Sequence, residues 1–237
     1  MLTQSSQLPR IARTDAGAIM VSEWSVDTAD RQTKTVQAFS RIWESEAWPI
    51  GLLSVNLFGS IDGTTIVNYA QWSHQDSYQA FTRTHLRSRL VEEIDRFVPG
   101  ISRKPPIRYV LYRSRAGQEA SPAGCVVIVS VEFDGPDEQR QRRWVDKVFD
   151  ALEAETELPP GGISGHFHLS TDGTRVLNYA EWTDEDSHRR ALASSGQGTV
   201  GRDPKWLEIR NYPGVVANEF KRCHLVCSYS SDAKGNG

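Results

Sequence analysis

An asparagine and a tryptophan four residues apart are the side chains whose types and spacing could do chemistry in this sequence. The pair occurs twice, as Asn68 with Trp72 and as Asn178 with Trp182. Side chains alternate along a strand, so each pair shares one face at a separation of about 13 Å. The small Ala70 between the first two leaves room for a flat molecule on the sheet. An amide and an indole N–H could hydrogen-bond an oxygen atom of that molecule.

The surroundings of the amide allow two interpretations. Asn68 shares its strand face with Ile66 and Ala70, and burying an amide without partners costs a few kcal/mol. Another side chain or a ligand must therefore satisfy it. In the structural alternative, Asn68 bonds a neighbouring backbone group and Trp72 only closes one end of a core.

Both strands belong to a longer repeat. Residues 60–77 read SIDGTTIVNYAQWSHQDS and residues 170–187 read STDGTRVLNYAEWTDEDS, with ten of the 18 positions identical at a constant offset of 110. The match extends outward with small changes of offset, which belong in loops. We interpret the chain as a duplication.

Each copy shows the same order of expected elements. Apolar spacing and turn signals predict strands at 19–24, 52–58, 65–72 and 107–112, with helices around 36–43 and from residue 76. The second copy repeats them at 126–133, 163–169, 175–182 and 222–226, with helices around 145–152 and from residue 186. Asp62-Gly63 and Asp172-Gly173 supply hairpin turns. The order βαββαβ predicts an α+β fold of two ferredoxin-like units.

The repeat also predicts the division of the chain. We expect a disordered tail over 1–15, a first domain over 16–115, a linker over 116–122, a second domain over 123–229 and a disordered tail over 230–237. A sheet with helices on one face leaves its other face bare. The two units are therefore expected to cover each other as an intramolecular pseudo-dimer, and a further homodimer is possible.

Composition excludes several classes of protein. The 237 residues carry a net charge of −3 and lack the basic excess that nucleic-acid binders show. No apolar run reaches the roughly 18 residues of a membrane span, and the first twenty residues lack a signal peptide, so we expect a cytoplasmic protein. Cys125, Cys223 and Cys227 have no zinc or redox spacing and are expected to be small buried side chains.

The Asn-Tyr-Ala-x-Trp strand, the Asp-Gly-Thr hairpin and the tandem length of about 110 residues per copy resemble the antibiotic biosynthesis monooxygenase family. Within it, the resemblance is to the cofactor-independent, quinone-forming anthrone oxygenases of aromatic polyketide pathways. It implies that the two units form a dimeric α/β barrel. In the family an Asn and a Trp on this strand line the pocket, and a Tyr six residues past the Trp assists. These catalytic roles fall here on Asn68, Trp72 and Tyr78. In the second copy they fall on Asn178 and Trp182, with His188 in place of the tyrosine.

The resemblance also implies the chemistry. The substrate would be a polycyclic, anthrone-like aromatic whose acidic C–H is deprotonated, so that the carbanion passes an electron to O₂ and a quinone results. O₂ is then the co-substrate, and neither flavin nor metal is expected. The sequence contains no HxxE-type metal motif. Haem-degrading relatives have a His ten residues after the Trp. At that position this chain has Thr82 in the first copy and Leu192 in the second.

Further residues are candidates for substrate binding. In relatives an Arg on or beyond the second helix contributes, and no arginine of this chain aligns securely with it. His166 and His168 share a strand face, so a metal site with His188 or His224 is an alternative, although no carboxylate joins them. The full set of candidates for substrate binding is Ala70, Ile66, Asn56, His166, His168, Arg87, Arg89 and Arg202.

Two other functions remain open at this point, an aromatic polyketide cyclase and a non-catalytic module that binds aromatic ligands. Of the two pockets, the N-terminal one is the better match to an oxygenase, because it keeps Tyr78 where the second copy has His188. A histidine that titrates near pH 6.5 would give the second pocket a different pH dependence.

Overall fold

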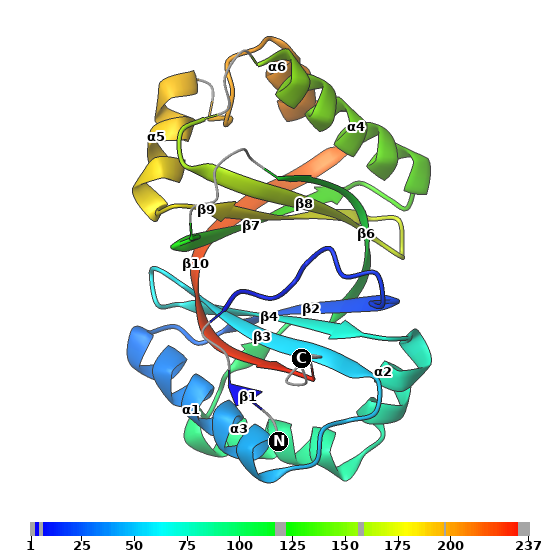
Figure 1. The fold of residues 1–237 in the computed structure, drawn as a ribbon, viewed down its shortest axis with the longest axis vertical. Coiled ribbons are helices and arrows are strands. Elements are labelled where there is room, and N and C mark those ends of the chain that lie inside the picture. Colours follow the sequence, from blue (N-terminus) through cyan, green and yellow to red (C-terminus); the bar gives the residue numbers. More distant parts are fainter. Residues whose placement is uncertain (1–2, 5–6, 117–121, 156–158, 197, 232–237) are drawn as a thin grey trace, which may run out of the picture. The chain divides into compact units, whose positions relative to one another are not determined.

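The computed structural model describes residues 3–4, 7–116, 122–155, 159–196 and 198–231. They form two compact units (Figure 1). Unit 1 combines residues 1–108 with 224–237, and unit 2 comprises residues 109–223. The expected linker lies almost wholly outside the described residues, as do parts of both expected tails.

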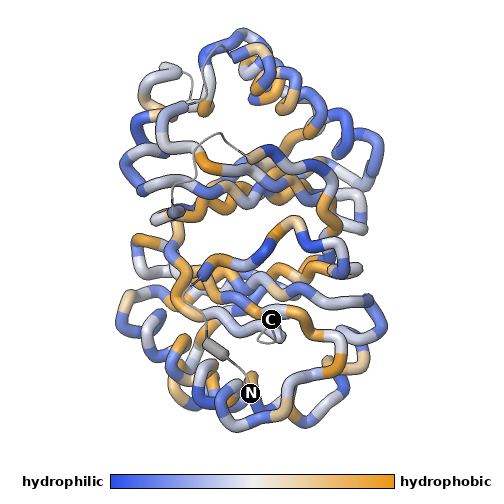
Figure 2. The backbone as a smooth tube through the Cα atoms, viewed as in Figure 1, coloured by the Kyte–Doolittle hydropathy of each residue, from blue (hydrophilic) through white to orange (hydrophobic). Residues whose placement is uncertain are grey.

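Unit 1 is an antiparallel sheet with helices, in the strand order β1-β10-β3-β4-β2. Figure 2 shows hydrophobic residues gathered along the strands and hydrophilic ones along the helices. The helix α1 buries Ala38, Phe39, Ile42 and Trp43, which recur at the three-to-four spacing of one helix face. The elements of this unit are β1 (Thr3–Gln4), β2 (Ala18–Ser25), α1 (Ala29–Ser45), β3 (Leu52–Ser60), β4 (Thr65–Trp72), α2 (Gln75–Thr82), α3 (His85–Phe97) and β5 (Ser102–Arg103), which pairs with the end of β2.

Unit 2 repeats this arrangement with the strand order β6-β8-β9-β7-β10. In both units a central strand, β4 or β9, lies between two antiparallel neighbours. The elements are β6 (Ile107–Ala116), β7 (Cys125–Phe133), α4 (Glu138–Ala154), β8 (Gly162–Ser170), β9 (Arg175–Trp182), α5 (Glu185–Ser195), α6 (Lys205–Arg210) and β10 (Val215–Ser230). The predicted α+β class with ferredoxin-like units is confirmed.

The two compact units and the two sequence repeats divide the chain at different residues. From Tyr109 onward β6 pairs with β8 and belongs to unit 2, whereas the residues of β10 from His224 onward belong to unit 1. Both strands run longer than their apolar residues indicated, because backbone pairing continues them through polar positions. Each repeat thus ends in a strand that contributes to the other unit.

Part of the segment expected as an N-terminal tail is structured. Thr3–Gln4 pairs with Tyr229 and Ser230 of β10. Ile11 is buried, and the buried Gln71 donates from Nε2 to the Arg10 carbonyl at 3.0 Å. The need of this buried amide for an acceptor explains why the chain is held there.

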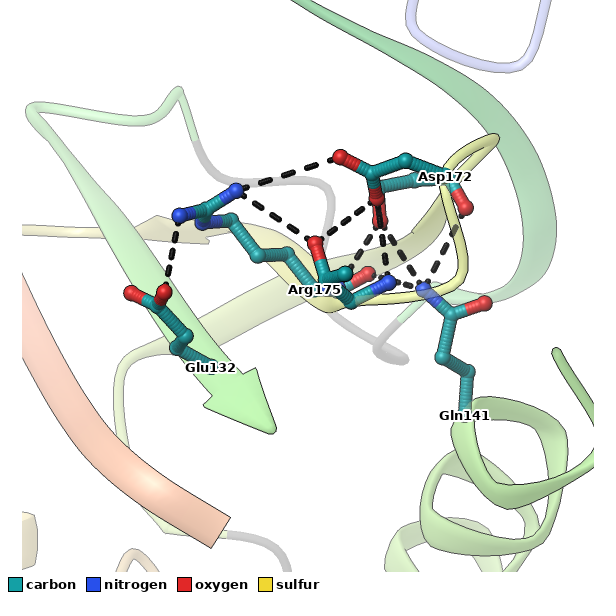
Figure 3. Close-up of polar contacts among 6 residues, drawn as sticks. Glu132, Gln141, Asp172 and Arg175 are labelled. Carbon is teal, nitrogen blue, oxygen red and sulfur yellow. Dashed lines mark hydrogen bonds and ion pairs between the residues drawn. The ribbon is translucent and has the colours of Figure 1, made fainter. Parts of the chain in front are cut away.

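The Asp-Gly-Thr hairpins, the most similar part of the repeat, have a structural role. Asp172 accepts hydrogen bonds at Oδ1 from the Ser170 hydroxyl (2.6 Å) and from the Thr174 backbone N–H (3.0 Å). The buried Gln141 of α4 reaches this turn and donates from Nε2 to the Arg175 carbonyl at 2.6 Å, while Arg175 pairs with Glu132 at 2.8 Å (Figure 3). The hairpin is therefore fixed to the helix that covers the sheet.

Unit 1 contains the same arrangement. Asp62 accepts from Ser60 at 2.6 Å, and Gln32 of α1 donates to the Ser60 and Thr65 carbonyls at 3.1 and 2.8 Å. Gln32 and Gln141 are thus equivalent, which sets the correspondence between α1 and α4 at an offset of 109.

The predicted burial of the three cysteines is confirmed, and all three are free thiols. No helix within the described residues is both long and apolar enough to cross a membrane.

We predict that Gly63→Ala destabilises the protein more than Gly100→Ala does. Both glycines have a left-handed φ, +76° and +78°, so either substitution costs about 1–2 kcal/mol of conformational strain. At Gly63 the new Cβ would also lie 2.9 Å from the backbone N of Ala29, at the start of α1, whereas at Gly100 nothing lies within 4 Å. Urea unfolding measures the two losses, and equal losses would contradict close packing of the hairpin on α1.

Candidate functional site

A cavity of about 520 Å³ lies in unit 2. Residues of β6–β10 and of the three helices α4, α5 and α6 line it. Asn178, Trp182 and His188 are among them, and Trp144 and Trp206 add two further indole rings. Pockets for small organic ligands span about 300–1,000 Å³ and are largely apolar. This cavity falls within that range.

Asn178 presents an unsatisfied amide to the cavity. Its neighbours across the sheet are Val129 on β7 and Phe167 on β8. Its Oδ1 is buried and has no hydrogen-bond partner among the described residues. An unpaired buried amide oxygen costs about 1–3 kcal/mol, so a ligand that carries a hydrogen-bond donor, such as a phenol O–H, can satisfy Asn178 Oδ1 on binding.

His188 is held in one orientation and one protonation state. Its ring meets those of Trp182 and Phe220 edge-on, with centroids 4.9 and 5.3 Å away. Arg222 donates from Nε to His188 Nδ1 at 3.0 Å. Because an arginine can only donate, Nδ1 must be the acceptor, and the imidazole proton is on Nε2.

The charge of His188 follows from the same surroundings. Burial, reinforced by the positive charge of Arg222, lowers its pKa to about 4. The imidazole is therefore neutral at pH 7 and acts as an N–H donor through Nε2. This differs from the expectation of a histidine titrating near pH 6.5, because sequence alone did not show the burial or the arginine.

Unit 1 has a corresponding but much smaller cavity of about 100 Å³. Asn68, Ala70, Trp72, Tyr78 and Arg87 all line it, so these sequence-predicted residues are brought together. The rings of Trp72 and Tyr78 meet edge to face, with centroids 5.6 Å apart. Asn68 Oδ1 and Trp72 Nε1 lack hydrogen-bond partners among the described residues. Burial raises the pKa of Tyr78, and the nearby Arg87 opposes the increase.

Side-chain volume explains the difference between the two cavities. Leu52 and Val55 lie opposite Trp72 and Ala70 in unit 1. The equivalent positions of unit 2 are Gly162 and Gly165, opposite Trp182 and Ala180. Two strand positions that fill the first cavity therefore leave space in the second.

Side chains of the helices add to the difference in volume between the two cavities. Phe39 and Trp43 of α1 line the small cavity. At the offset of 109 their equivalents in α4 are Val148 and Leu152, which line the large one. Phe81 of α2 adds a ring 5.2 Å from Trp72. Aromatic side chains thus occupy in unit 1 the space that is open in unit 2.

Four other candidates lie away from both cavities. Ile66 is fully buried in the core of unit 1. Asn56 is also fully buried, donates to the Tyr69 carbonyl at 3.1 Å and accepts from Ser228 at 2.8 Å. Arg89 forms an ion pair with Glu46, and Arg202 donates to the Ser194 carbonyl at 3.0 Å.

His166 and His168 alternate on β8 with Gly165 and Phe167, which line the large cavity, so the two histidines occupy the opposite face of the strand. His168 is fully buried, and burial lowers the pKa of both side chains to about 4. The described part of the chain contains no group of three His, Cys, Asp or Glu side chains placed to hold a metal ion.

Sequence reasoning missed Arg222, Phe220 and Arg115. They come from β10 and β6, and the pairing of these strands in unit 2 brings Phe220 and Arg115 to the cavity and Arg222 to His188, which lines it. A further pattern, Gly-x-Gly-x-x-Gly over residues 196–201, has the spacing of dinucleotide-binding loops. That function needs a preceding strand, whereas this run follows the helix α5.

A family model matches the part of the chain that holds the large cavity. Residues 126–201 match the family model described as antibiotic biosynthesis monooxygenase. Tetracenomycin-F1 monooxygenase of Streptomyces glaucescens is 39% identical over 62 residues, which are 26% of this chain and 54% of that protein. The chain thus spans about half the length of this curated relative.

A solved structure supports the fold over almost the whole chain. An anthrone oxidase-like protein superposes with a TM-score of 0.73 over 92% of this chain and 95% of its own, at 14% identity. At that identity the likeness shows the α+β, ferredoxin-like fold alone. The family match covers β7 to α5 and includes Asn178, Trp182 and His188. Residues 126–201, which include most of the lining of the large cavity, are therefore similar to the antibiotic biosynthesis monooxygenase family, and the chain is related in sequence to tetracenomycin-F1 monooxygenase.

Proposed function

We propose that this protein is a cofactor-independent monooxygenase that uses O₂ to oxidise a polycyclic, anthrone-like aromatic polyketide intermediate to a quinone or hydroxylated product. The observation that carries the proposal is the 520 Å³ cavity of unit 2, which combines aromatic walls with the polar groups of Asn178 and His188. These residues lie inside the segment that matches the monooxygenase family. The names of the sequence relative and of the structural neighbour support the substrate class.

The cavity volumes favour unit 2 over unit 1. A polycyclic molecule needs several hundred Å³, whereas a water molecule takes up about 30 Å³ of liquid. The 100 Å³ cavity of unit 1 is too small for fused rings. We therefore place the reaction in the second pocket, although Tyr78 made the first one the better candidate by sequence.

The reaction needs an anion to form inside an apolar site. The acidic CH₂ of an anthrone loses a proton to solvent water and gives a carbanion whose charge is delocalised onto the ring oxygen, and the proton is returned when the peroxide later breaks down to water. One electron passes to O₂, the two radicals combine to a peroxide, and cleavage of the O–O bond leaves a carbonyl and water. One oxygen atom of O₂ therefore enters the product, and the other leaves as water.

The residues of the pocket suit the stabilisation of that anion. The Nε2–H of the neutral His188 and the amide of Asn178 can donate to the developing oxyanion, and preorganised donors in a water-poor site are the largest contributors to many rate enhancements. The guanidinium of Arg222, 3.0 Å from His188 Nδ1, adds a fixed positive charge behind the donor. The rings of Trp182 and Phe220 pack against the imidazole ring and restrict its orientation.

The cyclase alternative needs a side chain that exchanges protons near neutral pH. His188, with a pKa of about 4 and its Nδ1 occupied by Arg222, suits hydrogen-bond donation better than proton exchange. The independence from flavin and metal, the cytoplasmic location, the pseudo-dimer and a further homodimer stay predictions.

We predict that Asn178→Ala lowers kcat/KM for an anthrone by about 10²-fold, the usual cost of removing one oxyanion donor. The assay measures O₂ consumption and the incorporation of one ¹⁸O atom from ¹⁸O₂ into the quinone, in EDTA and without added flavin or NAD(P)H. Trp182→Phe should also lower kcat/KM.

Asn68→Ala and Trp72→Phe are the matched variants in unit 1, and we expect much smaller losses from them. Larger losses there would move the reaction to the first pocket. Activity that disappears in EDTA and returns with a metal would contradict cofactor independence.

We also predict that His188 stays neutral, with its proton on Nε2, from pH 8 down to about pH 5.5. The physical reason is its pKa of about 4. Because the unfolded chain takes up this proton first, near pH 6.5, the contribution of His188 to folding stability is present above pH 6.5 and is lost as the pH falls toward 4. ¹⁵N NMR of the imidazole measures the tautomer and the titration, with His188→Gln to assign the signal. A midpoint near pH 6.5 would contradict this assignment.

A further inference from the structure

The charged side chains that line the large cavity are, among the described residues, all positive. Its charged lining residues are Arg115 and Arg210, and no Asp or Glu is among the described residues that line it. The walls around them are mostly aliphatic and aromatic. A guanidinium stays protonated in proteins, so it must find a counter-charge or remain solvated.

Arg115 is the more informative of the two arginines. It is half-buried near the end of β6, and within the described part of the chain it has no ion pair or hydrogen bond. The arginine two positions earlier behaves differently, because Arg113 pairs with Asp146 at 2.8 Å and stacks on Phe149. Arg115 therefore lines the cavity, and none of the described residues pairs with its guanidinium.

The position of Arg115 places it beside the predicted reaction site. Its partner across the β6–β8 pair is Gly165, and a Cβ added to Gly165 would lie 3.7 Å from Asn178 Oδ1. The same added Cβ would lie 3.6 Å from Phe167 Cε2, so Gly165 and the Phe167 ring form the cavity wall next to Asn178, and Arg115 lines the same cavity. A flat ligand lying on this wall can reach both the guanidinium and the amide.

The small cavity of unit 1 provides an internal comparison. Its charged lining residues are Arg87, Arg103 and Lys104. Arg103 pairs with Asp95 at 2.8 Å and Lys104 with Glu23 at 3.0 Å. The guanidinium of Arg87, like that of Arg115, has no ion pair or side-chain hydrogen bond among the described residues, but it lines a cavity too small for fused rings. Arg115 has the same unpaired state beside the cavity that can hold a ligand.

We propose that Arg115 binds a carboxylate carried by the aromatic substrate, so that the pocket selects anionic over neutral polycyclic molecules. The planar guanidinium can make two parallel hydrogen bonds to a carboxylate, which a neutral amide cannot match. The proposal rests on the proposed function for the ring system, and it adds the acidic substituent and the residue that recognises it.

Binding of two matched probes tests this inference. Anthraquinone-2-carboxylate and anthraquinone-2-carboxamide have the same rings and differ in charge, and quenching of tryptophan fluorescence reports their binding, since Trp144, Trp182 and Trp206 line the cavity. We expect the carboxylate to bind about 10- to 100-fold more tightly, as hydrogen bonds to charged groups imply. Raising the salt concentration should weaken only the carboxylate.

The variants then assign the preference to one residue. Arg115→Gln should reduce the ratio of the two dissociation constants to about 1 and leave the carboxamide affinity unchanged, which also shows that the pocket is folded. Arg115→Lys keeps the positive charge but cannot make two parallel hydrogen bonds to a carboxylate, so it should give an intermediate ratio of the two dissociation constants. Arg113→Gln, the same change two residues away, should keep the full ratio.

Two results would overturn the proposal: equal affinities in the unchanged protein, or a preference that survives Arg115→Gln. Its failure is separable from that of the proposed function. Selective carboxylate binding without O₂ consumption would reject the oxygenase and leave the anion site standing. O₂ consumption together with equal affinities for the two probes would reject the anion site and leave the oxygenase standing.

Discussion

Close packing between the sheet and its helices is the constraint on which the rest of this structure depends. Protein interiors are filled to the density of organic crystals, so a cavity survives only where the surrounding side chains are too small to fill it. Gly162 and Gly165 on β8, with Val148 and Leu152 on α4, leave such a space above β9. In unit 1 larger side chains close it, and the same Asn–Trp pair faces a cavity of only 100 Å³.

The sequence predicted the elements that local chemistry decides. Hairpin turns, apolar periodicity and the repeated strand indicated both ferredoxin-like units, and the placement of Asn178, Trp182 and His188 on one cavity follows from strand alternation and the next helix. The similarity of the two hairpins reflects structure: in each, a glutamine of the covering helix and an aspartate of the turn fix the hairpin to that helix.

What the sequence could not predict depends on contacts between distant segments. The volume of a cavity is set by side chains from several elements at once. Two copies with the same motif therefore have cavities whose volumes differ about fivefold. Arg222 lies 34 residues beyond His188 in the sequence, yet it determines which nitrogen carries the proton. The low pKa of His188 likewise results from burial and from that arginine. Asn56, His166 and His168 were plausible by residue type, but they lie on the strand faces turned away from the cavities.

The strand β10 has a consequence for how the chain is made. Its residues from His224 to Ser230 belong to unit 1, although the ribosome synthesises them after every residue of unit 2. Domains generally fold in order as they emerge, the N-terminal one first. Here the N-terminal unit must wait with an incomplete sheet until the second unit has been translated, whereas unit 2 has all of its strands as soon as Cys223 leaves the exit tunnel.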